Sequence, residues 1–216
     1  MIVLGIDPGT AVTGYGVVSR EGGGAASLVE CGVVRTDDSL ELAARLRTVH
    51  EGILDVIDRH RPTRIAVEGV FYARNVRTTV VLGHTRGAIL LAAALRDMQV
   101  AEYSPAEIKN AVCGTGRAAK SQVQFMVQQL LRLKAPPKPA DAADGVAVAL
   151  CDLQSHSLEA LVREQSVIEA RLVEKGNTPA NGSGVGRLLR TDQLSRPRAS
   201  AETLKPKAQS PEPQAP

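Results

Sequence analysis

Residues 3–18, VLGIDPGTAVTGYGVV, constrain the fold more than any other stretch of the chain. An apolar run ends on the carboxylate of Asp7, and a second apolar run follows the Pro8-Gly9 break. This pattern predicts two strands joined by a tight turn. Because a carboxylate beside a buried strand is costly to desolvate, Asp7 needs hydrogen bonds, a cation or exposure at the sheet edge. Taken alone, Asp7 is equally well interpreted as an ordinary turn residue.

The next segments alternate between strand and helix patterns. Residues 26–36 predict a third strand, which makes the first three strands an antiparallel meander. A helix is expected to follow, with Asp38 as its cap and Glu41 at the capping-box position. The apolar stretch RIAVE at 64–68 then ends on an acid, Glu68, as the first strand ends on Asp7. A strand reached through a helical crossover lies parallel to its neighbour, so both carboxylates are expected at the same sheet edge.

A long helix is expected over 76–98, with Gly83 and Gly87 near one face. Small residues four positions apart allow another element to approach closely, so this face packs either on its own sheet or on a second copy of the chain. Phe71 precedes the helix and forms an aromatic pair with Tyr72. The pair is either a packing plug between loop and sheet or a base-stacking platform.

The rest of the predicted domain contains a short strand over 100–103 and two helices over 105–114 and 121–133. Lys109 lies on the first of these helices, where it is equally compatible with a solvated surface. Lys120 lies at the start of the second, where the helix dipole disfavours a cation. An unfavourable position for a lysine indicates a functional role.

The last core helix begins with Asp141 and Asp144, which share a face because they lie three residues apart. Acids in a first helical turn are usually caps. In this chain, however, the two acids join Asp7 and Glu68, and each of the four lies at the end of an element in a topology that gathers those ends. Converging carboxylates of this kind predict a site for a divalent metal.

Composition divides the chain in two. Residues 175–216 are rich in Gly, Ser, Pro, Asn and Gln, and they carry seven Lys and Arg against three Asp and Glu. Such a segment buries too little surface to fold, so we expect a disordered basic tail. Residues 74–138 hold ten basic residues against three acids, which suits either a solvated face or a surface that binds a polyanion. The longest apolar run, 88–95, is too short to span a bilayer, and the three cysteines show no pairing pattern, so a soluble protein in the cytoplasm is expected.

Four blocks of the sequence resemble, in order and spacing, those of the RuvC-type Holliday junction resolvases of the ribonuclease H-like superfamily. They are GIDPGT at 5–10 with TGYGVV at 13–18, EGVFYARN at 68–75, GTGRAAKSQVQFMV at 114–127 and DAADGVAVA at 141–149. Four collinear blocks are a far more specific signal than any one of them. The resemblance covers roughly residues 1–160.

The resemblance implies an α/β fold, a five-stranded mixed sheet flanked by helices, in a nuclease domain over 1–170. It implies a homodimer that resolves four-way DNA junctions during recombination and repair, with two Mg²⁺ ions (Mn²⁺ possible) per active site and a branch-migration helicase complex as partner. The residues to which it assigns metal binding and catalysis are Asp7, Glu68, Asp141 and Asp144. Phe71 is implied to lie at the junction centre, and Lys109 and Lys120 to support DNA binding or chemistry. The chain departs from the family pattern at Ala11 and Gly69.

Two other functions are compatible with parts of the sequence. An actin-like or sugar-kinase-like ATPase also begins with an Asp-x-Gly-Thr turn, which Asp7 to Thr10 matches, but such a protein needs a second half that this chain is too short to supply. A non-catalytic junction-binding protein would keep the basic surface without needing the four acids. Metal-dependent nicking of a junction, compared with ATP hydrolysis, separates the three.

Overall fold

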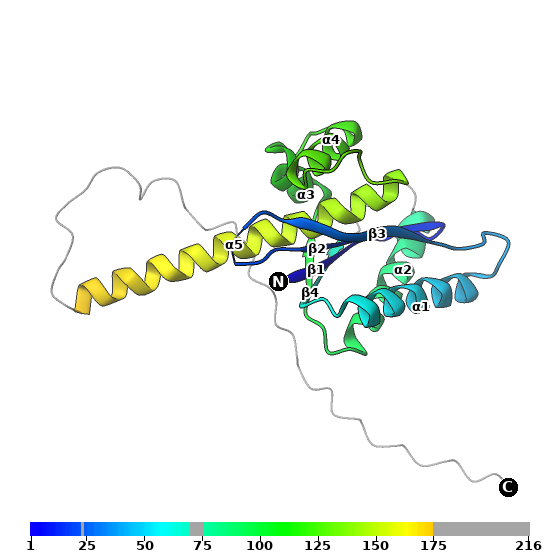
Figure 1. The fold of residues 1–216 in the computed structure, drawn as a ribbon. Coiled ribbons are helices and arrows are strands. Elements are labelled where there is room, and N and C mark those ends of the chain that lie inside the picture. Colours follow the sequence, from blue (N-terminus) through cyan, green and yellow to red (C-terminus); the bar gives the residue numbers. More distant parts are fainter. Residues whose placement is uncertain (23, 70–75, 175–216) are drawn as a thin grey trace, which may run out of the picture. The chain divides into compact units, whose positions relative to one another are not determined.

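The computed structural model describes residues 1–22, 24–69 and 76–174, and its centre is a five-stranded sheet of order β3-β2-β1-β4-β5 (Figure 1). The strands are β1 (Ile2–Asp7), β2 (Val12–Ser19), β3 (Ser27–Arg35), β4 (Arg64–Glu68) and β5 (Val100–Tyr103). β1 pairs antiparallel with β2, and β2 pairs antiparallel with β3. β4 runs parallel to β1, and β5 runs parallel to β4. The predicted mixed sheet with three antiparallel strands first is confirmed.

Helices cover both faces of this sheet. They are α1 (Leu42–His60), α2 (Val76–Ala94), α3 (Pro105–Cys113), α4 (Lys120–Leu130) and α5 (Ala140–Glu174). α1 and α2 lie on one face, while α5 lies on the other with α3 and α4 beyond it (Figure 1). None of the helices in the described ranges is long and apolar enough to cross a membrane. Contacts divide the chain into residues 1–171 and 172–216, and all of these elements except the last three residues of α5 belong to the first unit.

Side chains alternate between the two faces along β1 and β4. Leu4 and Ile65 belong to the core cluster under α1 and α2, which is filled by larger aliphatic side chains. Val3 and Ala66 belong to the other cluster, together with α5 residues. The alternation therefore turns both strand-terminal acids toward the face that α5 covers.

Helix α5 lies directly on the backbone of the sheet because glycines face it. A Cβ atom on Gly14 would overlap the carbonyl oxygen of Asp141, and one on Gly16 would lie 2.6 Å from the Cα atom of Val146. A Cβ on Gly5 of β1 would overlap the α5 backbone as well. Real Cβ atoms do not approach so closely, so any other residue at these positions would push the start of α5 away from the sheet.

A buried ion pair joins α5 to β4 three helical turns later. Asp152 is fully buried, and its two carboxylate oxygens accept hydrogen bonds of 2.9 Å from Nε and Nη2 of Arg64. The hydroxyl of Tyr103 donates to the same carboxylate over 3.0 Å. Both oxygens of Asp152 are thus hydrogen-bonded, which a buried carboxylate requires.

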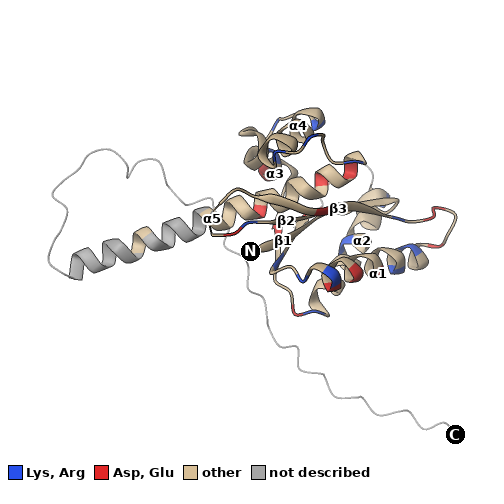
Figure 2. Ribbon diagram, in the orientation of Figure 1, with Lys and Arg blue, Asp and Glu red and all other residues tan. Residues whose placement is uncertain are grey.

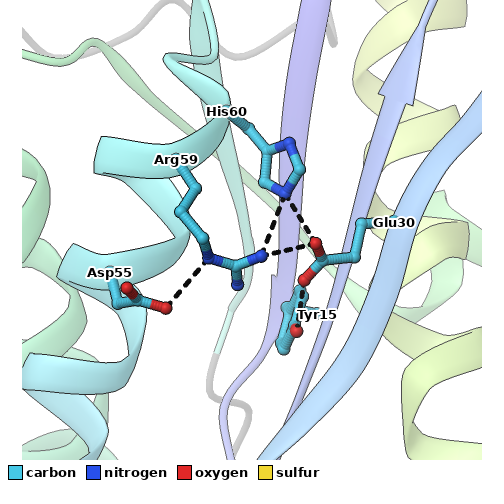
Figure 3. A network of polar contacts seen from close by, with 5 residues as sticks. All are labelled: Tyr15, Glu30, Asp55, Arg59 and His60. Atoms are coloured by element: carbon cyan, nitrogen blue, oxygen red, sulfur yellow. Dashed lines mark hydrogen bonds and ion pairs between the residues drawn. The ribbon is translucent and has the colours of Figure 1, made fainter.

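On the opposite face, a polar network joins α1 to β2 and β3 (Figure 3). Glu30 accepts hydrogen bonds from Tyr15 at 2.7 Å and from Arg59 at 2.5 Å, and it contacts Nε2 of His60 at 2.8 Å. Arg59 also donates to Asp55. These contacts, led by that with Arg59, lower the pKa of Glu30 to about 2. The network fixes the end of α1 against the sheet.

The predicted cap of α1 is wrong. The helix begins at Leu42 with Glu41 as its N-cap and without a side-chain cap bond. Asp37, rather than Asp38, makes a local turn, since its Oδ1 accepts hydrogen bonds from the amide and hydroxyl of Ser39. Competing local hydrogen bonds of this kind are typical of Asp and Ser.

Two predicted helix ends also differ. α2 ends at Ala94, four residues early, since Asp97 adopts a positive φ of 52°. α4 begins at Lys120 and ends at Leu130, before Arg132 with a φ of 51°. By contrast α3 starts as predicted after Ser104, where a reciprocal capping box with Glu107 forms.

We expect Asp152→Asn to lower the free energy of unfolding by roughly 3–5 kcal/mol, because it removes the negative charge of a buried ion pair with Arg64. Urea denaturation of the full chain measures this. Asp58→Asn is the matched control, since it removes a carboxylate that pairs with Arg96 at the surface and should change stability little. Equal effects of the two substitutions would contradict the special role of the buried pair.

Candidate active site

Asp7 and Glu68 lie side by side at the carboxyl ends of β1 and β4. The last paired residues of these parallel strands are Ile6 and Val67, and the two acids follow immediately. Strand alternation points both toward α5. The sequence-based expectation that the two carboxylates share one sheet edge therefore agrees with the described strand pairing.

Helix α5 brings the other two acids to the same edge. Asp141 lies in its first turn, over Gly14 of β2, and Asp144 follows on the same face. Burial raises the pKa of Asp7 to about 7, and the nearby charges of Glu68 and Asp144 contribute to this rise. The pKa of Glu68 is also raised, first by burial and then by Asp144. The four acids thus form one electrostatic cluster.

Two lysines face this cluster. The Nζ atom of Lys120 lies 2.6 Å from Oδ2 of Asp144 and 3.6 Å from Oδ1 of Asp141. The hydrogen bond to Asp144 is the largest of the causes that raise the pKa of Lys120. Lys109 of α3 is close enough to Glu68 for its charge to oppose the rise in the pKa of that acid. The helix dipole disfavours a cation at the start of α4, and the two carboxylates of α5 offset this electrostatic cost for Lys120.

The turn after Asp7 is held by polar contacts that the sequence did not reveal. The buried hydroxyl of Thr13 donates to the carbonyl oxygen of Gly9 over 2.8 Å. Thr36 and Arg45 donate to the carbonyl oxygen of Thr10 over 2.5 and 2.9 Å. In the sequence, the only indication of these contacts is that Thr13 follows Gly9 by four residues between the two predicted strands. These bonds keep the end of β1 in place.

Three positions named from the sequence remain: Ala11, Gly69 and Phe71. Ala11 is exposed in the turn after β1, and the amide of Gly69 donates to the carbonyl oxygen of Tyr103 over 2.8 Å. Phe71 lies outside the described residues, so its predicted place at a junction centre stays a prediction.

The chemistry of the acid cluster fits a hard divalent cation. Carboxylate oxygens are the ligands that Mg²⁺ and Mn²⁺ prefer, and clustered acids with raised pKa values gain most from a positive charge. Within the described ranges, no group of three or more His, Cys, Asp or Glu already has the geometry of a metal site. The ammonium of Lys120 holds Asp144 and Asp141 instead.

The sheet order and the helices on its two faces define the protein as one of the ribonuclease H-like class. Solved structures agree: at 14% identity, a yeast mitochondrial Holliday junction resolvase, Ydc2, matches with a TM-score of 0.51 over 69% of this chain and 77% of that chain, which shows the shared fold.

The chain belongs to the RuvC family, because the family model "Crossover junction endodeoxyribonuclease RuvC" matches residues 3–152. A RuvC of Pelotomaculum thermopropionicum is 45% identical over 74% of this chain and 96% of its own length. A RuvC of Parafrankia sp. is 52% identical over 71% and 86%. The structure of Thermus thermophilus RuvC is 39% identical, with a TM-score of 0.65 over 70% of this chain and 92% of that chain. The same protein in complex with a Holliday junction substrate matches with a TM-score of 0.66 and 38% identity.

The raised pKa of Asp7 gives a prediction about stability. The native state binds a proton at Asp7 more tightly than the unfolded state, so native stability falls as pH rises from about 4 to about 7. Asp7→Asn removes this titration. In metal-free buffer, the variant should gain stability over the wild type by on the order of 3–4 kcal/mol between pH 4 and pH 8, at about 1.4 kcal/mol per pKa unit. Urea denaturation at several pH values measures the difference, and a difference that stays constant with pH would contradict it.

Proposed function

We propose that this protein cuts four-way DNA junctions by metal-dependent hydrolysis of a phosphodiester bond in each of two strands. The single observation that carries the proposal is the cluster of Asp7, Glu68, Asp141 and Asp144 at one sheet edge, faced by Lys109 and Lys120. A relative of 38% identity has been solved with a Holliday junction substrate, which supports the choice of DNA.

The family is one of metal-dependent nucleases, and we assign its metal to the four acids. We propose two Mg²⁺ ions per site, with Mn²⁺ as a substitute, because this chemistry needs an activated water and a neutralised leaving oxygen, and bound metal supplies both. Asp7, Glu68 and Asp144 would hold metal, with Asp141 as the fourth acid. Lys109 and Lys120 would balance the charge of a DNA phosphate that approaches these carboxylates.

Separate observations argue against the two alternative functions, an ATPase and a non-catalytic junction-binding protein. Family membership over residues 3–152 favours a nuclease over an actin-like or sugar-kinase-like ATPase. A junction-binding protein without catalysis would have no need to bury an acid with the raised pKa of Asp7. Burying carboxylates close together costs stability, so their presence supports catalysis.

A homodimer is part of this proposal. Gly83 and Gly87 face open space, since a Cβ atom on either would have no neighbour within 4 Å in the described structure. This observation favours a second copy over the protein's own sheet as the partner of their face. The same side of α2 exposes large apolar side chains, with exposed fractions from 50% to 75%: Val76, Val80 and Leu91, followed by Leu95 directly after the helix. Two active sites related by symmetry would match the two scissile strands of a junction.

Three further points stay predictions. We assign residues 1–170 to the nuclease domain, while the predicted disordered basic tail, 175–216, lies outside the described residues. A branch-migration helicase complex as partner follows only from the family resemblance. A location in the cytoplasm follows from the short apolar runs and the unpaired pattern of the cysteines in the sequence.

We expect Asp7→Asn, Glu68→Gln and Asp144→Asn each to abolish junction cleavage in Mg²⁺ while junction binding stays within a few fold of wild type. Each removes a metal-binding charge, and loss of negative charge does not weaken attraction to phosphate. Asp141→Asn should behave alike. Gel-based nicking and binding assays on a four-way junction measure both properties.

Asp152→Asn serves as the control for this experiment, because it alters α5 away from the acid cluster and should keep cleavage at temperatures where it is folded. Normal cutting in Mg²⁺ by any of the acid variants would remove that residue from the site. A cleaving wild type without ATP hydrolysis would exclude both alternative functions.

We expect Gly87→Leu to give a folded monomer that loses paired incision of the two strands. Added bulk should separate two helices packed at roughly 8–10 Å, while leucine favours the helix more than glycine does. Sedimentation measures the association state. Glu51→Leu places the same leucine side chain on the exposed surface of α1 and should remain dimeric. A dimeric Gly87→Leu would locate the contact elsewhere.

A further inference from the structure

A cavity of about 310 Å³ lies between the end of α3 and helix α4. Its lining residues come from the last residue of α3, the turn after it and one side of α4: Cys113, Thr115, Ser121, Gln122, Phe125 and Met126. The volume falls within the range of roughly 300–1,000 Å³ that is typical of small-molecule sites. It is large enough for one flat ring system.

Phe125 gives this cavity an aromatic wall that the core does not use. α4 packs on the domain through Val123 and Val127, which are buried, whereas Phe125 is 58% exposed. A large aromatic side chain that is open to solvent and also lines a cavity offers one ring face to a ligand. The aromatic ring therefore marks this side of α4 as a binding surface.

Polar groups lie beside the aromatic wall. Gln122 accepts a hydrogen bond from the amide of Ala119 through Oε1 at 2.8 Å, and its Nε2 makes no hydrogen bond to the described residues. The hydroxyls of Ser121 and Thr115 also line the cavity, and Thr115 accepts weakly from the amide of Arg117 at 3.4 Å. A ring face combined with a few hydrogen-bonding groups is the environment that holds an unstacked nucleobase.

One helix, α4, carries both a lysine of the proposed active site and part of the cavity lining. Lys120, which contacts Asp144 at 2.6 Å, is the first residue of α4, and the cavity lining resumes with Ser121. Phe125 lies about 7 Å further along the helix axis, at 1.5 Å per residue. Figure 2 shows Lys and Arg positions around α3 and α4. Arg117, in the turn between the two helices, is exposed.

We propose that this cavity receives one base of the junction strand, close to the phosphate to be cut, with Phe125 stacking on its ring. The proposal rests on the proposed function. Gln122, Ser121 and Thr115 contact the edge of the base and distinguish one base from another. The cavity thereby holds the strand in position next to the acid cluster.

The test measures coupling between Phe125 and individual bases. Full-length protein and its Phe125→Ala, Phe125→Leu and Phe125→Tyr variants are titrated with four-way junctions in EDTA, and binding is followed by fluorescence anisotropy. Each junction carries a single abasic site at one position within three nucleotides of the incision. On the intact junction, Phe125→Ala should weaken binding by roughly 5- to 150-fold, as expected for loss of one stacked base. Phe125→Leu should behave alike, and Phe125→Tyr should bind as the wild type does.

The decisive result is position-dependent. At one position, the abasic site should weaken junction binding by the wild type as much as Phe125→Ala weakens binding to the intact junction. Combining that abasic site with Phe125→Ala should weaken binding no further than either change alone. Effects that multiply at every position, or no loss from Phe125→Ala, would overturn the proposal and leave the cavity to a protein partner. Thermal unfolding shows whether each variant is folded. Failure of the wild type to nick junctions in Mg²⁺ would instead refute the proposed function, so the two failures are distinguishable.

Discussion

The contact between helix α5 and the backbone of the sheet is the constraint on which the rest of the structure depends. Gly14 and Gly16 of β2 leave no space for a side chain between strand and helix. Because α5 lies this low, the acids of its first turn reach the sheet edge where Asp7 and Glu68 end their strands. A side chain at either glycine would push the first turn of α5 away from the sheet. Asp141 and Asp144 would then be separated from the other two carboxylates, although the sheet itself would be unchanged.

The start of α5 and the region around Asp152 differ in how their buried carboxylates are compensated. Near its start, four acids share one small volume, and burial and mutual repulsion raise the pKa values of Asp7 and Glu68. Lys120 offsets only part of that cost. Three turns later, Asp152 is more deeply buried and yet fully hydrogen-bonded to Arg64 and Tyr103. The second arrangement stabilises the fold, whereas the first sacrifices stability for a site that can accept a cation.

Sequence patterns predicted the antiparallel first three strands and the shared edge of Asp7 and Glu68 because alternation, crossover direction and chain order determine which strand ends meet. They failed where local alternatives compete, as at Asp38, where the neighbouring Asp37 binds Ser39 instead. They also missed features that depend on long-range contact. Nothing local in β2 reveals that Gly14 faces a helix more than a hundred residues later, nor that Asp152 meets Arg64. The pairing of Lys120 with Asp144 was visible only as a lysine in an unfavourable place.

The glycine contact also determines how the domain can change over evolutionary time. The layer between the sheet and α1 is built from large aliphatic side chains, which can exchange for one another as long as their total volume is kept. Where Gly14 and Gly16 meet α5 the backbone itself fills the space, so compensating substitutions are not available at these positions. Sequence drift is therefore expected in the aliphatic layers, while these glycines change little even though they touch no ligand.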